Sequence, residues 1–286
     1  MRKFLKWLGY GGLALVALAL IVALWIWFVS WRAIGSTDAP VAERLARPSA
    51  MQLADAPRQA RVLGCVSCHG AGLRGHLMFD APGVATIWAP NLTRVAARAT
   101  DQQLAQAIRQ GVGHDGRPLW VMPSGLLSRL EDGEVSALIA WIRSLPRGGA
   151  ETPRVRVGPL GRLGIALGQF EPAPASLEHF RTVRAFDGGR AYAAGRRIAE
   201  RVCADCHGPD LRGGHPGPDE TAPDLAIAGA YDAAQFRTLM RTGRPPNGRD
   251  LGLMRRIAVQ DLSGLSDDEI AALHAYLSER AQRAPQ

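Results

Sequence analysis

Cysteine and lysine are both scarce in this sequence of 286 residues. Its four cysteines all belong to two copies of one short motif, so no fifth cysteine is left to serve as an additional ligand. Lysine is confined to Lys3 and Lys6, and every other basic residue is arginine. A GC-rich genome accounts for this arginine bias, so the net charge of +8 does not by itself indicate nucleic-acid binding.

Charged residues are absent from Trp7 to Trp31, a run of 25 residues. A helix of that length would span roughly 37 Å at about 1.5 Å per residue, enough to cross a bilayer. Tryptophans near both ends resemble an aromatic belt. The alternative is a cleaved signal peptide, with Ala33 and Gly35 as its cleavage site, but such peptides have apolar cores of only about 7–15 residues. We therefore expect an uncleaved membrane anchor over residues 1–35.

The four cysteines form the segments CVSCH (65–69) and CADCH (203–207). CxxCH is the attachment signature of c-type haem. Its two thiols lie one helical turn apart and add to the haem vinyl groups, and the next residue places an imidazole under the ring. The motifs predict two covalent haem c groups, attached through Cys65, Cys68, Cys203 and Cys206, with His69 and His207 as iron ligands.

Three other uses of paired cysteines explain the pattern less well. Two zinc knuckles are usually separated by about 15–20 residues and need no adjacent histidine. A thioredoxin-type redox pair requires a single CxxC and no histidine beside it. Structural disulfides occur in exported proteins, but they explain neither the spacing nor the histidine.

The rest of the chain is an internal repeat. CVSCHGAGLRG (65–75) matches CADCHGPDLRG (203–213) at seven of eleven positions, and residues 104–122 align without a gap to residues 236–254. We therefore predict two copies of one domain, over 48–147 and 186–286. Residues 148–185 form a linker rich in proline and glycine, which we expect to pack along the domains because VGPLGRLGIAL is apolar.

Both copies show the patterns of short helices joined by loops. Thr100 with Gln103, and Ser266 with Glu269, have the spacing of capping boxes. Apolar residues recur at helical spacing in the last helix of each copy, at Val135, Leu138, Ile139 and Ile142, and at Ile270, Leu273 and Leu277. The helix before the first motif is expected to start at Asp55–Pro57 and to be short.

The segments APNLT (89–93), GRPLWVMPS (116–124) and GRDLGLM (248–254) resemble those of class I cytochrome c domains. The whole chain resembles the membrane-anchored dihaem cytochrome c family of bacteria. This resemblance implies a mainly α fold, with an N-terminal transmembrane helix followed by two tandem all-α class I cytochrome c domains. It also implies close contact between Gly195 and the last helix, whereas Pro57 stands at the matching place in the first copy.

The resemblance further implies the remaining haem ligands. Class I domains bind the far side of the iron through a methionine on a loop near the last helix, and Met122 and Met254 align at that loop. Arg255 stands where the first copy has Pro123, so the second copy departs from the family pattern. The competing ligands are His76 and His215. Met240 aligns with Ile108 and is expected to be a core residue.

Class I domains hold the second nitrogen of the proximal histidine with a proline carbonyl in a GPNL-like turn. APNL (89–92) and APDL (222–225) match that turn, so Pro90 and Pro223 are the expected acceptors.

Methionine and histidine together would close both axial positions, which favours electron transfer over catalysis. We therefore expect no catalytic residues and an electron carrier of a respiratory chain. Because bacterial haem c is attached outside the inner membrane, a single-pass protein with periplasmic haem domains is expected. Its redox partners would be a quinol-oxidising complex, a dehydrogenase or a terminal oxidase. Nucleic acid is not expected as a partner, since four basic residues flank the span and two haems would add about four propionate charges.

Four other functions compete with a free carrier. The protein could be a fixed cytochrome subunit of a membrane dehydrogenase or of a haem-copper oxidase, with an indistinguishable sequence. A dihaem peroxidase would need an open ligand face, which the paired methionine loops disfavour. A thiosulfate-oxidising dihaem enzyme would need a further cysteine ligand. A redox sensor would need a signalling module, and no segment suggests one.

Overall fold

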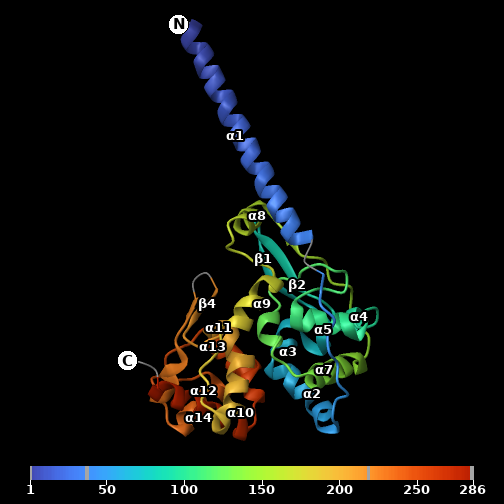
Figure 1. The fold of residues 1–286 in the computed structure, drawn as a ribbon, viewed down its shortest axis with the longest axis vertical. Coiled ribbons are helices and arrows are strands. Elements are labelled where there is room, and N and C mark those ends of the chain that lie inside the picture. Colours follow the sequence, from blue (N-terminus) through green and yellow to red (C-terminus); the bar gives the residue numbers. More distant parts are fainter. Residues whose placement is uncertain (1, 36–38, 218–219, 284–286) are drawn as a thin grey trace.

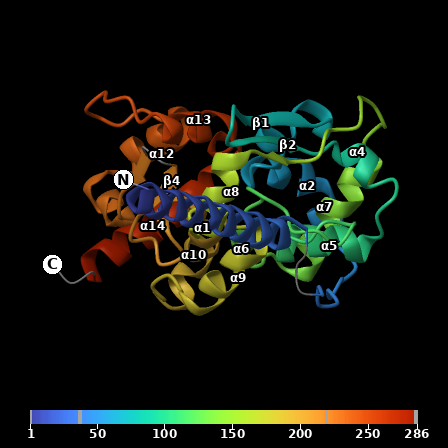
Figure 2. The same ribbon diagram turned by 90° about the horizontal axis from the view of Figure 1, so that it is seen from above.

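The computed structural model describes residues 2–35, 39–217 and 220–283. One long helix, α1 (Arg2–Gly35), projects from a body made of two helical units that lie side by side (Figures 1 and 2). Gly9–Gly35 of this helix is long and apolar enough to cross a membrane. Ser36, near which a processed chain would begin if the segment were a cleaved signal peptide instead of the expected anchor, lies outside the described residues.

The first unit runs from α2 to α7 and is drawn in blue to green (Figure 1). Its helical segments are α2 (Ala50–Val62), α3 (Cys65–His69), η1 (Ala71–Leu73), α4 (Leu92–Val95), α5 (Asp101–Gln110), α6 (Ser124–Leu127) and α7 (Asp132–Ser144). The chain then continues through β3 (Arg156–Val157), α8 (Pro159–Ala166) and α9 (Ala173–Thr182).

The second unit runs from η2 to α14 and is drawn in orange to red. Its helical segments are η2 (Arg190–Tyr192), α10 (Ala193–Ile198), the π-helical segment η3 (Ala199–Cys203), α11 (Ala204–His207), η4 (Leu225–Ala230), α12 (Ala233–Thr242), α13 (Leu253–Gln260), η5 (Leu262–Gly264) and α14 (Asp267–Arg283). The expected mainly α fold with two tandem units is confirmed.

Each unit also contains a short antiparallel hairpin that the sequence patterns did not predict. In the first unit β1 (His76–Ala81) pairs with β2 (Ala85–Ala89), and β3 pairs on the other side of β2. In the second unit β4 (Gly214–Gly217) pairs with β5 (Glu220–Ala222). The strands are too short and irregular to show a clear alternation of apolar and polar residues, which is the pattern that predicts a strand.

The helix before the first motif is longer than expected. α2 starts at Ala50 rather than at Asp55–Pro57, because Ser49 and Gln52 form a capping box: each side chain accepts from the other residue's backbone N–H. The sequence pattern Ser-x-x-Gln at residues 49–52 is typical of a capping box and indicates that a helix begins there. Pro57 lies in the middle of the helix, where it lacks the amide that would otherwise donate to the carbonyl of Leu53.

The predicted helical stripes form the core. Val135, Leu138, Ile139 and Ile142 of α7 are buried, as are Ile270, Leu273 and Leu277 of α14, and both belong to one apolar cluster shared by the two units. The expected capping boxes at Thr100–Gln103 and Ser266–Glu269 are present. Met240 is buried in this core, as expected.

Gly195 permits the closest helix crossing of the second unit. A Cβ atom at this position would lie 2.0 Å from the Ala272 carbonyl oxygen and 2.7 Å from Cβ of Tyr276 on α14. Any larger residue would separate α10 from α14, so the expected contact of Gly195 with the last helix is confirmed. In the first unit α2 packs against α7 in the corresponding way, although Pro57 replaces the glycine.

Candidate functional site

Both cysteine motifs fold into short helical turns with the same exit. His69 and His207 are each followed by a glycine with positive φ, Gly70 (76°) and Gly208 (78°). Each histidine carbonyl then accepts a 2.8 Å hydrogen bond from an amide six residues on, that of Gly75 or Gly213. The identical loops show that the repeated sequence encodes a repeated local structure.

Each motif histidine is held by the predicted proline carbonyl. His69 Nδ1 lies 2.9 Å from the Pro90 oxygen, and His207 Nδ1 lies 2.8 Å from the Pro223 oxygen. A carbonyl can only accept, so Nδ1 carries the proton and Nε2 carries the lone pair. Burial lowers the pKa of both histidines, which favours the neutral ring. Within the described residues neither Nε2 makes a hydrogen bond, so the metal-binding atom of each ring is available.

Two side chains that the sequence analysis did not single out hold these proline turns: Asn91, which is buried, and Asp224, which is partly exposed. Asn91 is 1 % exposed, and its Nδ2 donates to the carbonyl oxygens of Gly148 (2.8 Å) and Ala150 (3.0 Å). In the second unit Asp224 stands at the matching position. It accepts 2.5 and 2.7 Å hydrogen bonds from Nη1 of Arg280 and the amide of Ala226. Both residues directly follow the proline of a matched turn, and this position in the sequence could have identified them as supports.

The two proline turns are therefore secured by different chemistry. In the first unit a neutral amide ties the turn to the chain that leaves α7. In the second unit a carboxylate ties it to α14, and Arg280 is 6 % exposed at its side chain. Burial raises the pKa of Asp224, but the hydrogen bonds from Arg280 and Ala226 outweigh it and leave that pKa below its ordinary value.

No disulfide joins the four cysteines, all of which lie in the described part of the chain. Burial, followed by the charge of the neighbouring thiol, raises the pKa of Cys65 and of Cys203 to about 12. Thiol–disulfide exchange requires the thiolate, which such a pKa makes rare near neutrality. The chemistry of these thiols therefore disfavours a thioredoxin-type redox pair.

The two predicted methionines lie in different local settings. Met122 follows Val121, which has φ of 67°, and precedes the short helix α6. Met254 lies in the first turn of α13, where Arg255 in place of a proline allows the helix to continue to Gln260. Both side chains are partly buried and pack against the apolar cluster.

The competing ligands lie on the hairpins. His76 begins β1 and is exposed, and His215 lies in β4 and is also exposed. Unlike His69 and His207, neither makes a hydrogen bond to a proline carbonyl in the described part of the chain.

The first motif also contacts the second unit directly. Ser67, between Cys65 and Cys68, donates a 3.1 Å hydrogen bond to Oδ2 of Asp261 at the end of α13. Asp261 is 3 % exposed, and its burial raises its pKa to about 6. The negative charges of both Asp261 and Asp205 act on the Cys68 thiol, so the two cysteine motifs face the same seam between the units.

Arginines reinforce this seam from both units. Arg58 of α2 donates to Glu269 Oε2 at 2.6 Å, and Arg201 beside the second motif donates to Glu134 Oε1 at 2.7 Å. We call this surface the seam; it is made by α2, α3, α6 and α7 against η3, η5, the end of α13 and the first turn of α14. The sequence analysis missed its residues because partners lie far apart in the chain.

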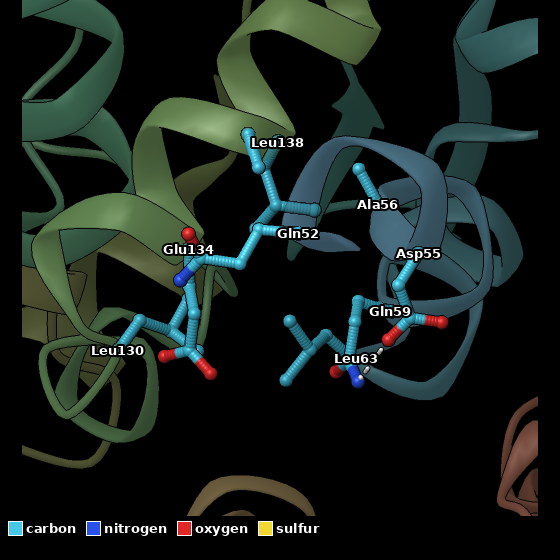
Figure 3. Close-up of a pocket in the computed structure, with 9 residues that line it drawn as sticks. Gln52, Asp55, Ala56, Gln59, Leu63, Leu130, Glu134 and Leu138 are labelled. Carbon is cyan, nitrogen blue, oxygen red and sulfur yellow. Dashed lines mark hydrogen bonds between the residues drawn. The ribbon is translucent and has the colours of Figure 1, made fainter. Parts of the chain in front are cut away.

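A small groove between α2 and α7 is distinct from both motifs. Leu63, Leu130 and Leu138 line it together with polar side chains, among which Asp55 accepts a hydrogen bond from Gln59 (Figure 3). None of the predicted haem-binding residues lines this groove. It is a gap in helix packing rather than the predicted redox site.

The donors in each unit fit covalent haem c. Two thiols lie one helical turn apart, and a neutral imidazole with a free Nε2 follows them directly. Thioether formation and histidine ligation need these three groups. Met122 of the first unit and Met254 of the second pack against the apolar cluster that the two units share.

Comparison with known proteins agrees with this geometry. The family model described as "Cytochrome c" matches residues 54–146 and, separately, residues 192–281. The fructose dehydrogenase cytochrome subunit of Gluconobacter japonicus is 26 % identical over 241 residues, which is 74 % of this chain and 49 % of that protein. The chain thus spans about half the length of this curated relative. With both units matched by the family model and each built around a CxxCH turn, this chain belongs to the cytochrome c family as a protein with two tandem cytochrome c domains.

Proposed function

We propose that this protein is a membrane-anchored dihaem c-type cytochrome that transfers electrons between respiratory partners on the periplasmic side of the bacterial inner membrane. The observation that carries the proposal is the twofold occurrence of a CxxCH turn whose histidine is held by a proline carbonyl. When bound, haem c supplies reversible one-electron transfer at its iron. Two cytochrome c domains imply two such groups.

The proposed roles of the residues follow from their chemistry. Cys65, Cys68, Cys203 and Cys206 form the thioether bonds. The Nε2 atoms of His69 and His207 bind iron, and the carbonyls of Pro90 and Pro223 keep those atoms deprotonated and oriented.

We propose Met122 and Met254 as the second axial ligands. The burial of both side chains against the apolar cluster supports them over His76 and His215, which are exposed. A ligand pair on each iron would leave no open position for a substrate. This supports an electron carrier without catalytic residues.

The proposed organisation is an anchor over 1–35, domains over 48–147 and 186–286, and a linker over 148–185. The helix limits support it, because the first domain ends with α7 at Ser144 and the second begins with η2 at Arg190. The length and apolar character of Gly9–Gly35 support the anchor. The domains then lie on the outer side, where haem c is attached.

A fixed cytochrome subunit of a membrane dehydrogenase is the second candidate. It is favoured by the similarity to a protein whose name is fructose dehydrogenase cytochrome subunit. In this role the protein would accept electrons from a dehydrogenase and pass them towards the respiratory chain. Purification from detergent-solubilised membranes distinguishes the two: a fixed subunit co-purifies with a dehydrogenase in constant ratio, and a free carrier does not.

Haem content tests the central proposal. The matured polypeptide should retain its haem after denaturation and should weigh two haem groups more than the bare chain by intact mass spectrometry. Cys65→Ala combined with Cys68→Ala should remove one haem, and the matched pair Cys203→Ala with Cys206→Ala should remove the other. A single adduct in fully matured wild-type protein would contradict the dihaem proposal.

A further inference from the structure

Helix α8 packs against the last turns of α1, on the side of the body from which α1 projects (Figures 1 and 2). Arg162 of α8 donates a 2.9 Å hydrogen bond from Nη1 to Oγ of Ser30, which is fully buried. Ile26, Val29 and Ala33 of α1 are also less exposed than their neighbours. Spacing of three and four residues puts them on one face with Ser30, so α8 covers a defined face of α1.

The contact lies at the end of the apolar span. Trp27 and Trp31 flank Ser30 and are 52 % and 55 % exposed. Such tryptophans mark the boundary between acyl chains and headgroups. The guanidinium of Arg162 at the same level also belongs at this boundary, since a charge is costly in the hydrocarbon. An anchor inserted through α1 therefore brings α8 to the membrane surface.

The inner face of α8 is set by a close contact with the first domain. A Cβ atom at Gly161 would lie 2.2 Å from the carbonyl oxygen of Val84, in the turn between β1 and β2. The amides of Gly158 and Leu160 donate to the carbonyls of Val84 and Gly83. This contact prevents α8 from rotating about its axis.

The opposite face of α8 is an exposed apolar stripe. Leu160, Leu163 and Leu167 are 61 %, 38 % and 58 % exposed, at spacings of three and four residues. The helix contains no acidic residue. Because the inner face is fixed, these leucines cannot turn inward.

We propose that α8 is an interfacial helix that lies in the bilayer surface, with Leu160, Leu163 and Leu167 in contact with lipid acyl chains. The occupant of this face is lipid, because α8 packs against the last turns of the membrane-spanning helix, at the level of the exposed Trp27 and Trp31. The inference rests on the proposed membrane anchoring. It gives the first domain a second attachment, which fixes its orientation to the membrane and hence the surfaces that face redox partners.

Photochemical labelling by lipid tests this inference in the full-length protein. The photoreactive amino acid p-benzoylphenylalanine would replace Leu163 or Leu167 in the haem-loaded protein, reconstituted in phosphatidylethanolamine–phosphatidylglycerol vesicles. Leu18, in the middle of α1, is the positive control. Ile227, 50 % exposed on η4 of the second domain, is the matched control away from α1. Unchanged haem absorption spectra would verify that each variant is folded.

After irradiation, mass spectrometry should find lipid adducts at positions 18, 163 and 167 and none at 227. Labelling at 18 without labelling at 163 and 167 would overturn the interfacial role of α8 and leave the anchor standing. Equal labelling at 163, 167 and 227 would also overturn it. Absence of labelling at 18 would overturn the anchor itself, and the inference with it.

Discussion

At the scale of single residues, the prolines of the two matching turns, APNL and APDL, determine which nitrogen of each motif histidine can bind iron. Because Pro90 and Pro223 present only acceptors to Nδ1, each ring keeps its lone pair on Nε2. Asn91 and Asp224 then hold these prolines by different means. A mutation at either support should therefore affect one haem site and leave the other unchanged.

The axial methionines give a prediction at the same scale. Met122→Ala should open the first haem to carbon monoxide and lower its reduction potential, because thioether ligation favours ferrous iron. The shift should be a fraction of the roughly 0.8 V that axial ligands span. Redox titration with optical spectra measures it. Met254→Ala should act in the same way on the second haem.

Met240→Ala provides the control for these variants. It removes a buried methionine from the core without touching a proposed ligand, so it should lower stability by about 2–5 kcal/mol and leave both spectra unchanged. If Met254→Ala left the second haem's spectrum unaltered, His215 would become the preferred ligand.

At the scale of secondary-structure elements, each domain packs the helix before its cysteine motif against its last helix, but the two contacts differ in detail. Gly195 lets α10 approach α14 at backbone distance, and the Tyr276 hydroxyl donates a 2.8 Å hydrogen bond to the Phe186 carbonyl beside the crossing. In the first domain α2 contains Pro57 and begins earlier, at a capping box.

Replacing Gly195 tests the importance of the crossing. Gly195→Ala should destabilise the protein by about 1–3 kcal/mol, because the new Cβ would overlap the Ala272 carbonyl and force α10 and α14 apart. Gly164→Ala in α8 is the matched control, since no atom lies within 4 Å of its added Cβ. That change should stabilise the helix by about 0.5–1 kcal/mol. Denaturant unfolding in detergent measures both, and equal effects would contradict the prediction.

At the scale of the whole molecule, the seam brings both cysteine motifs to one interface. Ser67 of the first motif and Asp261 of the second domain meet there, and Arg58 and Arg201 cross it to carboxylates. The seam and the shared apolar cluster make the domains one body. This arrangement supports a relay in which electrons pass between the two domains.

Asp261 makes the stability of this seam dependent on pH. Burial raises its pKa to about 6, so between about pH 4 and pH 6 the folded protein binds more protons than the unfolded chain. The contribution of Asp261 to the free energy of unfolding is therefore fully present below about pH 4, and it is lost as the pH rises through about 6. One pKa unit corresponds to about 1.4 kcal/mol, which puts the loss at up to about 3 kcal/mol.

Asp261→Asn should remove this part of the pH dependence. The variant should be more stable than the wild type at pH 8 and similar to it near pH 4, as measured by denaturant unfolding across that range. Asp250→Asn is a suitable control, because the side chain of Asp250 is 71 % exposed. A wild-type protein whose stability rises relative to the Asn variant between pH 4 and pH 8 would contradict the assignment.

The anchor makes a prediction for the protein in its membrane. The chain should stay in the membrane fraction after a high-salt wash and should keep its original N-terminus, because an apolar helix of this length is held by lipid rather than by charge. N-terminal sequencing of both fractions measures this. A soluble form beginning near Ser36 would show instead that the segment is a signal peptide.

The sequence by itself determined the features that depend on local spacing. The two CxxCH segments, the proline turns APNL and APDL, the apolar stripes of α7 and α14 and the uncharged run through α1 were all readable, because each lies within one helix or one turn. The repeat then implied two equivalent units. The start of α2 was also encoded locally, by Ser49 and Gln52, although the expected start lay farther along the chain.

Only the tertiary structure decided which distant segments meet. The hairpins, the tie from Asn91 to the chain after α7, the ion pair of Asp224 with Arg280, the contact of Ser67 with Asp261 and the packing of α8 on α1 were not apparent from the sequence. Outside the hairpins, the bonded partners are separated by 56 to 194 residues. Their pairing depends on how the helices pack together. The periodic spacing of apolar residues indicates which face of a helix is buried, but it does not indicate which segment covers that face.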